Sequence, residues 1–132
     1  MSKVFADTSA LYALLASGDS QHENARRAFE RLAAEEAALV TSSYVLVETY
    51  ALVDRRLGRE ASARFREEFA PLLEVIWVGR DIHEQALDLF LAGSRVVSLV
   101  DAASFACMHA MRIDRVWTLD RHFAGEGFEI VA

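Results

Sequence analysis

The sequence predicts an α/β fold: a single-domain α/β/α sandwich with a central, mostly parallel sheet of about five strands. Short apolar runs alternate along the chain with longer helical patterns, and this alternation is typical of a parallel sheet covered by helices. The 132 residues contain no linker, repeat or low-complexity stretch, and 53% of them are hydrophobic, which is enough for one core. We therefore expect residues 1–132 to form one domain, with helices on both faces of the sheet.

Short apolar runs are expected to form the strands. Each run is rich in aliphatic or aromatic residues, as is typical of strands buried in a parallel sheet. The last two runs flank a short turn of helix. The expected strands span residues 3–7, 39–41, 74–78, 115–119 and 128–131.

Signals for helix starts and ends place helices between these strands. Ser20 and Glu23 have the spacing of a capping box, and Ser98 and Asp101 repeat that spacing. Gly58 is a helix-ending residue. A serine at position 42 or 43 is expected to cap the start of the helix that ends at Gly58. The expected helices span residues 9–16, 20–34, 42–58, 59–69, 81–93 and 98–111.

Composition limits the environment and the partners. The single cysteine, Cys107, permits no intrachain disulfide, as expected in a reducing cytoplasm. The N-terminus lacks a signal-peptide pattern, and no apolar run approaches the ~20 residues that span a bilayer, so we expect a cytoplasmic protein with no membrane partner. The net charge of -6 argues against nucleic acid only if no metal offsets the acids.

Acidic residues far apart in the chain fall at similar structural places. Two of them end strands and two lie near helix starts: Asp7, Asp120, Glu48 and Asp101. If the strands are parallel and neighbouring, all four meet at the edge formed by the carboxyl ends of the strands, where ligands bind. Carboxylates that share a small space need cations or protons to neutralise them. Oxygen ligands favour Mg²⁺ or Mn²⁺, so the pattern predicts a metal site that acts on phosphate esters.

Each acid also has a structural explanation when it is taken singly. Asp7 could cap a helix, Asp101 could complete a capping box, and Asp120 could form a turn. Glu48 could lie at a helix edge and reach water, although its neighbours on the helix are uncharged. The metal hypothesis therefore rests on the combination of the four.

The segments around these acids resemble the motifs of PIN-domain ribonucleases. The stretch Val-Phe-Ala-Asp-Thr-Ser-Ala-Leu at residues 4–11 is similar to the opening of that family. Glu48 lies where the second acid of the family falls, residues 98–102 resemble the third acid motif, and residues 118–123 resemble the fourth. The resemblance covers essentially the whole chain, and it is closest to VapC-type toxins of type II toxin–antitoxin systems.

This resemblance implies metal-dependent endonucleolytic cleavage of RNA that leaves a 5′-phosphate and a 3′-hydroxyl. It implies that the four acids hold one or two Mg²⁺ or Mn²⁺ ions and form the catalytic site. Thr8, Ser9 and Thr118 would be supporting groups that position water or phosphate. The resemblance further implies a homodimer and a cognate antitoxin whose peptide occupies the toxin groove.

Two other functions stay open. A PIN-like module could bind or process RNA, or bind protein, without a toxin role. An α/β phosphotransfer domain with an aspartate nucleophile is the second alternative. Such domains need a lysine near the phosphate, but the only lysine, Lys3, lies at the wrong end of its strand. Ser9 stands where a dehalogenase-like site would place a second acid, and the chain has no glycine-rich nucleotide loop.

Residues outside the four motifs are expected to have less specific roles. His122 is expected to pack or to contact phosphate rather than to catalyse. Trp77 and Trp117 are expected to lie in strands and in the core. The arginines of residues 55–59 could hold an RNA backbone or an acidic antitoxin segment, or form a solvated helix face.

Overall fold

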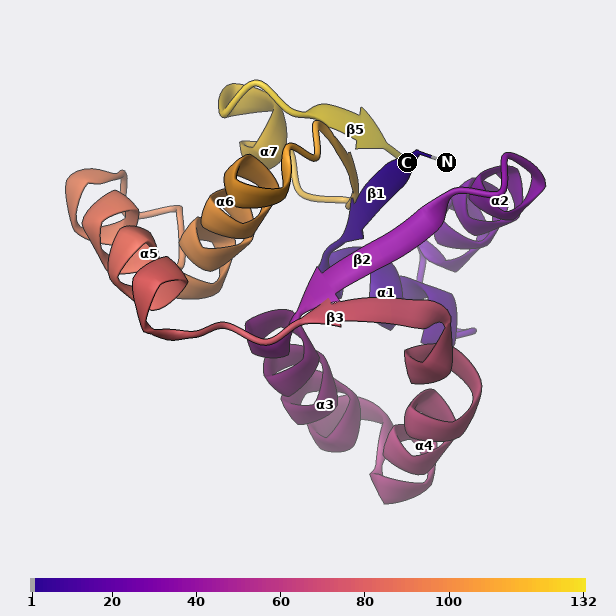
Figure 1. The fold of residues 1–132 in the computed structure, drawn as a ribbon. Helices are drawn as coiled ribbons and strands as arrows, with labels where there is room; N and C mark the ends of the chain where they lie inside the picture. Colours follow the sequence, from indigo (N-terminus) through magenta and orange to yellow (C-terminus); the bar gives the residue numbers. More distant parts are fainter. Residues whose placement is uncertain (1) are drawn as a thin grey trace.

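Five short strands form one sheet at the centre of the molecule, and all neighbouring strands are parallel (Figure 1). The structure is a computed structural model that describes residues 2–132. The strands lie in the order β3-β2-β1-β4-β5. The predicted parallel sheet is confirmed, with strand ends that differ from the expected ones by up to two residues. The strands are β1 (Lys3–Ala6), β2 (Ala38–Ser42), β3 (Leu73–Ile76), β4 (Arg115–Trp117) and β5 (Glu129–Val131).

Helices cover both faces of the sheet, as predicted (Figure 1). The helices are α1 (Thr8–Leu15), α2 (His22–Ala34), α3 (Ser43–Leu57), α4 (Arg59–Arg64), α5 (Arg80–Ala92), α6 (Leu99–Met111) and α7 (His122–Gly125). The first four lie on one face and the last three on the other. Within residues 2–132, no helix combines the length and the apolar character needed to cross a membrane.

The strand order contains a switch point between β1 and β4. The chain adds β2 and then β3 on one side of β1, and it returns to add β4 and β5 on the other side. Because crossovers between parallel strands are right-handed, this reversal moves α5, α6 and α7 to the opposite face. The helices diverge at the carboxyl ends of β1 and β4, and this divergence leaves room for a ligand there.

The core is centred on β1. Residues 4–6 are fully buried, because a central parallel strand is covered by helices on both sides. Trp117 in β4 is also fully buried, and the ring of Phe29 lies 5.7 Å from it. The prediction that Trp77 belongs to the core is wrong, since its side chain is 75% exposed. The edge strand β3 ends at Ile76, and Trp77 lies in the connection that leaves the sheet.

The two predicted capping boxes have different outcomes. The box at the start of α6 is confirmed, with the Asp101 amide donating to Ser98 Oγ at 3.0 Å and the Ser98 amide donating to the Asp101 carboxylate at 3.3 Å. The box of Ser20 and Glu23 is wrong, because α2 begins at residue 22 with no side-chain cap. The Glu23 carboxylate instead pairs with Arg26, one turn along the helix, at 2.7 Å.

The predicted helix of residues 59–69 is divided. After α4, the chain forms a π-helical turn (Phe65–Phe69) and then a 3-10 turn (Ala70–Leu72). Phe65 is buried in this arrangement, with its ring 5.2 Å from that of Tyr50 in α3. The proline in the 3-10 turn has no amide hydrogen to continue a helix, so the chain passes into β3.

Replacing Trp117 by alanine is expected to lower the free energy of unfolding by about 3–5 kcal/mol, because a fully buried indole is lost and a cavity remains. The matched change Trp77→Ala removes an exposed indole and is expected to alter this free energy by less than about 0.5 kcal/mol. Urea unfolding followed by circular dichroism measures both variants. Equal losses for the two would contradict their difference in burial.

Candidate functional site

The four acids predicted from the sequence converge at the switch point of the sheet, where they form what we call the acidic cluster. Asp7 follows β1, Asp120 follows β4, Glu48 lies in the second turn of α3, and Asp101 lies in the first turn of α6. Carboxylate oxygens of Asp101 and Asp120 lie within 4.8 Å of each other. Burial, and then the charge of Asp7, raise the pKa of both Glu48 and Asp101. The charge of Asp7 therefore acts on both Glu48 and Asp101.

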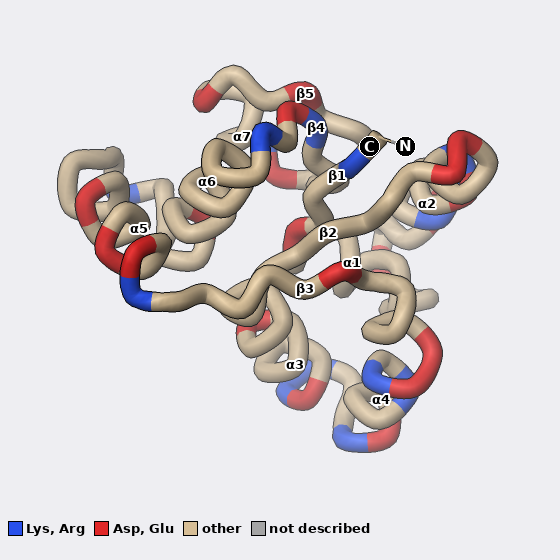
Figure 2. Tube along the Cα trace, viewed as in Figure 1, with Lys and Arg blue, Asp and Glu red and all other residues tan. Residues whose placement is uncertain are grey.

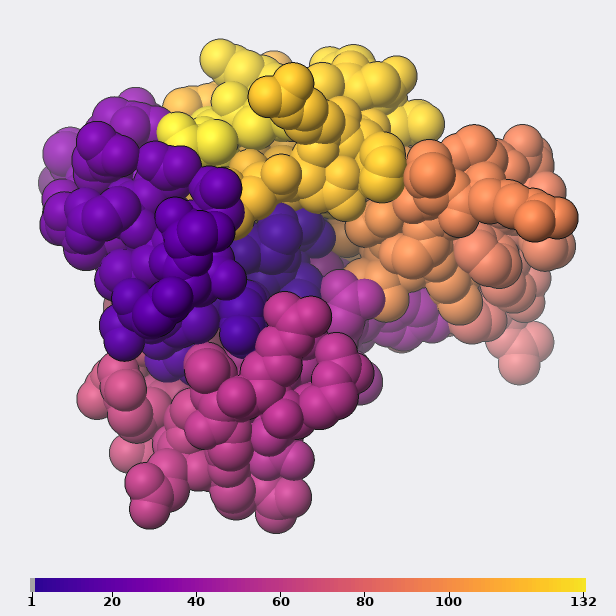
Figure 3. All heavy atoms as spheres, turned by 180° about the vertical axis from the view of Figure 1, so that it is seen from behind, coloured from indigo at the N-terminus to yellow at the C-terminus, as the bar shows by residue number. Residues whose placement is uncertain are grey.

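A hollow in the molecular surface marks this edge of the sheet. Figure 3 shows the hollow in the middle of one face, where the N-terminal segment (indigo), the segment around residue 120 (gold) and α3 (magenta) meet. Asp7 is the most deeply buried of the four acids, with 4% of its surface exposed, and the other three are partly exposed. A ligand that enters from solvent would therefore meet those three first.

Hydroxyl groups from two segments hold the Asp7 side chain. Ser9 Oγ and Thr118 Oγ1 each donate to Oδ2 of Asp7 at 2.8 Å. The two hydroxyl oxygens also accept hydrogen bonds, Ser9 from the Leu119 amide at 2.9 Å and Thr118 from the Asp120 amide at 3.0 Å. Each hydroxyl has only one proton, so a hydroxyl that donates to Asp7 cannot donate to another acceptor. This network fixes the orientation of the Asp7 carboxylate.

Asp7 has no cationic partner among the ion pairs of residues 2–132. Burial raises the pKa of Asp7, although the hydrogen bonds from Thr118 and Ser9 oppose this shift. A buried carboxylate without a compensating charge destabilises the fold. A bound cation would remove this cost.

Thr8 and Glu48 lie where α1 packs against α3. Thr8 Oγ1 donates to the carbonyl oxygen of Val45 at 3.4 Å and accepts from Thr49 Oγ1 at 3.3 Å. Burial raises the pKa of Glu48, the Thr8 hydroxyl lowers it, and the charge of Asp7 raises it further. Thr8 is 5% exposed and bonded to α3, so a role in positioning water or phosphate stays a prediction.

Asp101 combines a helix-capping contact with a place in the acidic cluster. Burial raises the pKa of Asp101 to about 6, the hydrogen bond from the Ser98 amide opposes this shift, and the charges of Asp7 and Asp120 add to it. The capping contact uses Oδ2. A carboxylate has a second oxygen that can bind a ligand, so the capping role does not exclude a ligand role.

His122 is a candidate site residue that sequence reasoning did not assign to the cluster. Its Nδ1 lies 2.9 Å from Oδ1 of Asp120, and the same oxygen accepts from the His122 amide at 3.0 Å. Together with Asp101 and Asp120, His122 offers ligand atoms that all lie within 4.8 Å of one another. The only signal in the sequence was a histidine two residues after an acid, which is too common to be informative.

The set of donors suits a hard divalent cation. The carboxylates of Asp101 and Asp120 and the imidazole of His122 form a group of possible ligands, and carboxylate oxygens favour Mg²⁺ or Mn²⁺. Asp7, Glu48 and Asp101 all have a raised pKa, and none of them forms an ion pair within residues 2–132. A cation here would offset the repulsion and could also hold the oxygens of a phosphate group.

Comparison with known proteins relates this arrangement to a family. The chain matches the family model of the PIN domain over residues 4–126. It is 36% identical over 127 residues to the 23S rRNA-specific endonuclease VapC20 of Mycobacterium tuberculosis, and the match covers 95% of each chain. The protein of that name from a second strain of the species matches equally well.

Solved structures agree with this match. The crystal structure of Mycobacterium tuberculosis VapC20, described as a Sarcin-Ricin loop cleaving toxin, has a TM-score of 0.82 at 35% identity and covers 95% of each chain. A toxin–antitoxin complex from Klebsiella pneumoniae and FitAcB from Neisseria gonorrhoeae each have a TM-score of 0.72, covering 98% of this chain and 96% of the other. Their identities of 20% and 15% show a shared fold alone. The family model and the identity to VapC20 show that the chain belongs to the PIN-domain family.

Proposed function

We propose that this chain is a metal-dependent endoribonuclease and the toxin of a type II toxin–antitoxin pair. The observation that carries the proposal is the convergence of four carboxylates at the switch point of the sheet, where three of them have no basic partner within residues 2–132. The 36% identity to a 23S rRNA-specific endonuclease supports cleavage of RNA and makes 23S rRNA the first candidate substrate. The likeness of the VapC20 crystal structure supports the toxin role.

In this proposal, Asp7, Glu48, Asp101 and Asp120 hold one or two Mg²⁺ or Mn²⁺ ions. The bound metal would activate a water for attack on the phosphodiester and neutralise charge on the leaving oxygen. The protein's own contribution is orientation. Ser9 and Thr118 fix the Asp7 carboxylate by hydrogen bonds of 2.8 Å, so its position does not depend on the ligand.

His122 is proposed as a positioning residue for Asp120. Both its ring Nδ1 and its amide contact Oδ1 of Asp120, which restricts rotation of that carboxylate. A nitrogen of the imidazole also lies within 4.8 Å of a carboxylate oxygen of Asp101 and of one of Asp120, so the imidazole could itself serve as a ligand.

The homodimer and the cognate antitoxin are also proposals. Several large apolar side chains are available for such partners, and four of them are 63–77% exposed: Val47, Trp77, Leu91 and Val96. Where such side chains form a contiguous patch, the surface is typical of a protein-binding site.

The alternative functions are less well supported. A phosphotransfer domain with Asp7 as nucleophile needs a lysine at the phosphate, but Lys3 lies at the opposite end of β1 and pairs with Glu74 at 3.6 Å. A module that binds without cutting would not need carboxylates held at the cost of a raised pKa. Measuring RNA cleavage separates all three functions.

Asp7→Asn is expected to reduce RNA cleavage by about 100-fold or more, because one charge that holds the metal is lost while the shape is kept. The test is induced expression in a bacterial host with sequencing of RNA 5′ ends. The wild type should stop growth and create discrete new ends, and the variant should not. Asp88→Asn, at an exposed position of α5, is the matched control and should behave as the wild type. New ends that persist in Asp7→Asn would contradict the proposal.

Added Mn²⁺ is expected to stabilise the protein by mass action, by about 2.7 kcal/mol at 100 times the Kd, or roughly 10 °C in Tm. The double variant Asp7→Asn/Asp101→Asn should lose this rise. Acidic positions also occur on α5 (Figure 2), so the exposed pair Asp81→Asn/Asp88→Asn provides a control of equal charge that should keep the rise. An equal rise in both double variants would place the metal elsewhere.

The Mn²⁺-dependent rise in Tm is expected to shrink as pH falls through about 6. The folded pKa of Asp101 is raised from 3.8 to about 6, so without metal its protonated form favours folding at low pH, and this contribution is lost as pH rises through about 6. Metal binds the ionised carboxylate, so the stabilisation by Mn²⁺ grows as pH rises through about 6. Thermal melts with and without Mn²⁺ at pH 5 to 7.5 measure the rise in Tm. A rise that is constant over that range would contradict the role of Asp101.

A further inference from the structure

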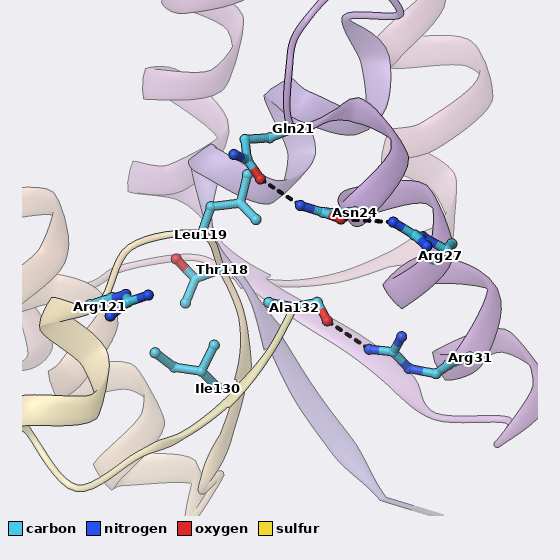
Figure 4. A pocket seen from close by; sticks show the side chains of 9 residues that line it. All are labelled: Gln21, Asn24, Arg27, Arg31, Thr118, Leu119, Arg121, Ile130 and Ala132. Carbon is cyan, nitrogen blue, oxygen red and sulfur yellow. Dashed lines mark hydrogen bonds between the residues drawn. The ribbon is translucent and has the colours of Figure 1, made fainter.

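A second cavity adjoins the acidic cluster and carries the opposite charge. It has a volume of about 730 Å³ and lies between one side of α2, the segment after β4 and the end of β5 (Figure 4). Its polar lining includes three guanidinium groups and two amides: Arg27, Arg31, Arg121, Gln21 and Asn24. We call this cavity the arginine groove.

Two arginines of the groove, Arg27 and Arg121, form no ion pair with an acid within residues 2–132. Arg27 donates to the amide oxygen of Asn24 at 3.0 Å, and Arg31 donates to the carbonyl oxygen of Ala132 at 2.7 Å (Figure 4). The amide oxygen of Asn24 is uncharged. The positive charges of Arg27 and Arg121 therefore remain in the groove.

A neighbouring arginine on the same helix shows that the lack of acidic partners on α2 is particular to the groove. Arg26 lies on α2 outside the groove, and its guanidinium pairs with Glu23 at 2.7 Å and also with Glu30. Arg26 is thus paired with acids, whereas Arg27, which faces the groove, has only the neutral amide of Asn24 as its partner. An anionic ligand would supply the missing charge.

The groove is continuous with the acidic cluster. Thr118 lines the groove, and its hydroxyl donates to Asp7 in the cluster at 2.8 Å. Arg121 lines the groove and directly follows Asp120 of the cluster. A polyanion that leaves the cluster on this side would therefore meet the guanidinium groups next.

We propose that the arginine groove binds the backbone phosphates of the RNA strand beside the cleavage point, an inference that rests on the proposed endoribonuclease function. Carboxylates of the cluster repel every phosphate that is not bound through metal, so the strand needs positive charge at its flank. Guanidinium groups suit phosphate because they donate two parallel hydrogen bonds. The amides of Gln21 and Asn24 can bond to ribose or to a base edge without adding charge.

The test measures binding and cleavage of a single-stranded oligoribonucleotide by Arg27→Gln/Arg121→Gln. Binding is measured in proteins that also carry Asp7→Asn, so that the RNA stays intact. We expect affinity to fall by about tenfold for each arginine. The slope of log affinity against log salt should become shallower by about 1.4, since each contact to a single strand contributes about 0.7.

Two matched variants make the result specific. Arg66→Gln removes one positive charge from an exposed arginine of the π-helical turn, outside the groove, and should keep the wild-type affinity and slope. Arg27→Lys/Arg121→Lys keeps both charges and should restore the salt slope. Circular dichroism of each variant establishes that it is folded.

The outcomes separate this inference from the function on which it rests. If proteins with Asp7 intact do not cut the RNA, the proposed function is wrong and the groove proposal is overturned with it. If they cut it, but the glutamine pair binds RNA as Arg66→Gln does, the groove proposal alone is overturned. Retained RNA affinity with lost binding of a polyglutamate probe would overturn it too and would assign the groove to an acidic polypeptide.

Discussion

The buried carboxylate of Asp7 is the constraint on which the site depends. It lies at the end of the central strand β1, where the covering helices diverge, and within residues 2–132 it has hydroxyl donors but no basic partner. Burial raises its pKa, so the fold holds a group that is stable there only with a proton or a positive charge beside it. Such a locally unfavourable arrangement is typical of functional sites, because the ligand supplies what the fold lacks.

The apolar frame around Asp7 makes this arrangement possible. The Asp7 amide donates to the Trp117 carbonyl at 3.0 Å, so sheet pairing between β1 and β4 continues up to the acid itself. The side chains of Asp7, Ser42 and Ser98 cap α1, α3 and α6, respectively. The N-termini of these helices carry partial positive charge, which reduces the repulsion among the acids without neutralising it.

Net charge describes this surface poorly. The chain carries -6 overall, yet the acids of the cluster and the arginines of the groove lie beside each other through Thr118 and through the neighbours Asp120 and Arg121. Arg26 and Arg27 are adjacent in sequence, but only Arg26 has acidic partners. Helical geometry separates them, because consecutive residues point about 100° apart around the helix.

The succession of strands and helices along the chain and the parallel sheet were predictable from sequence, as was the placement of four acids at strand ends and helix starts, because hydrophobic periodicity and the positions of strand ends are local properties. Local signals also failed at Ser20, where an ion pair replaced a cap, and at Trp77, where an apolar residue left the sheet. The contact of His122 with Asp120, and the groove shared by Arg27 and Arg121, became visible only in the folded chain. These contacts depend on packing between distant segments and on side-chain direction, which sequence spacing does not encode.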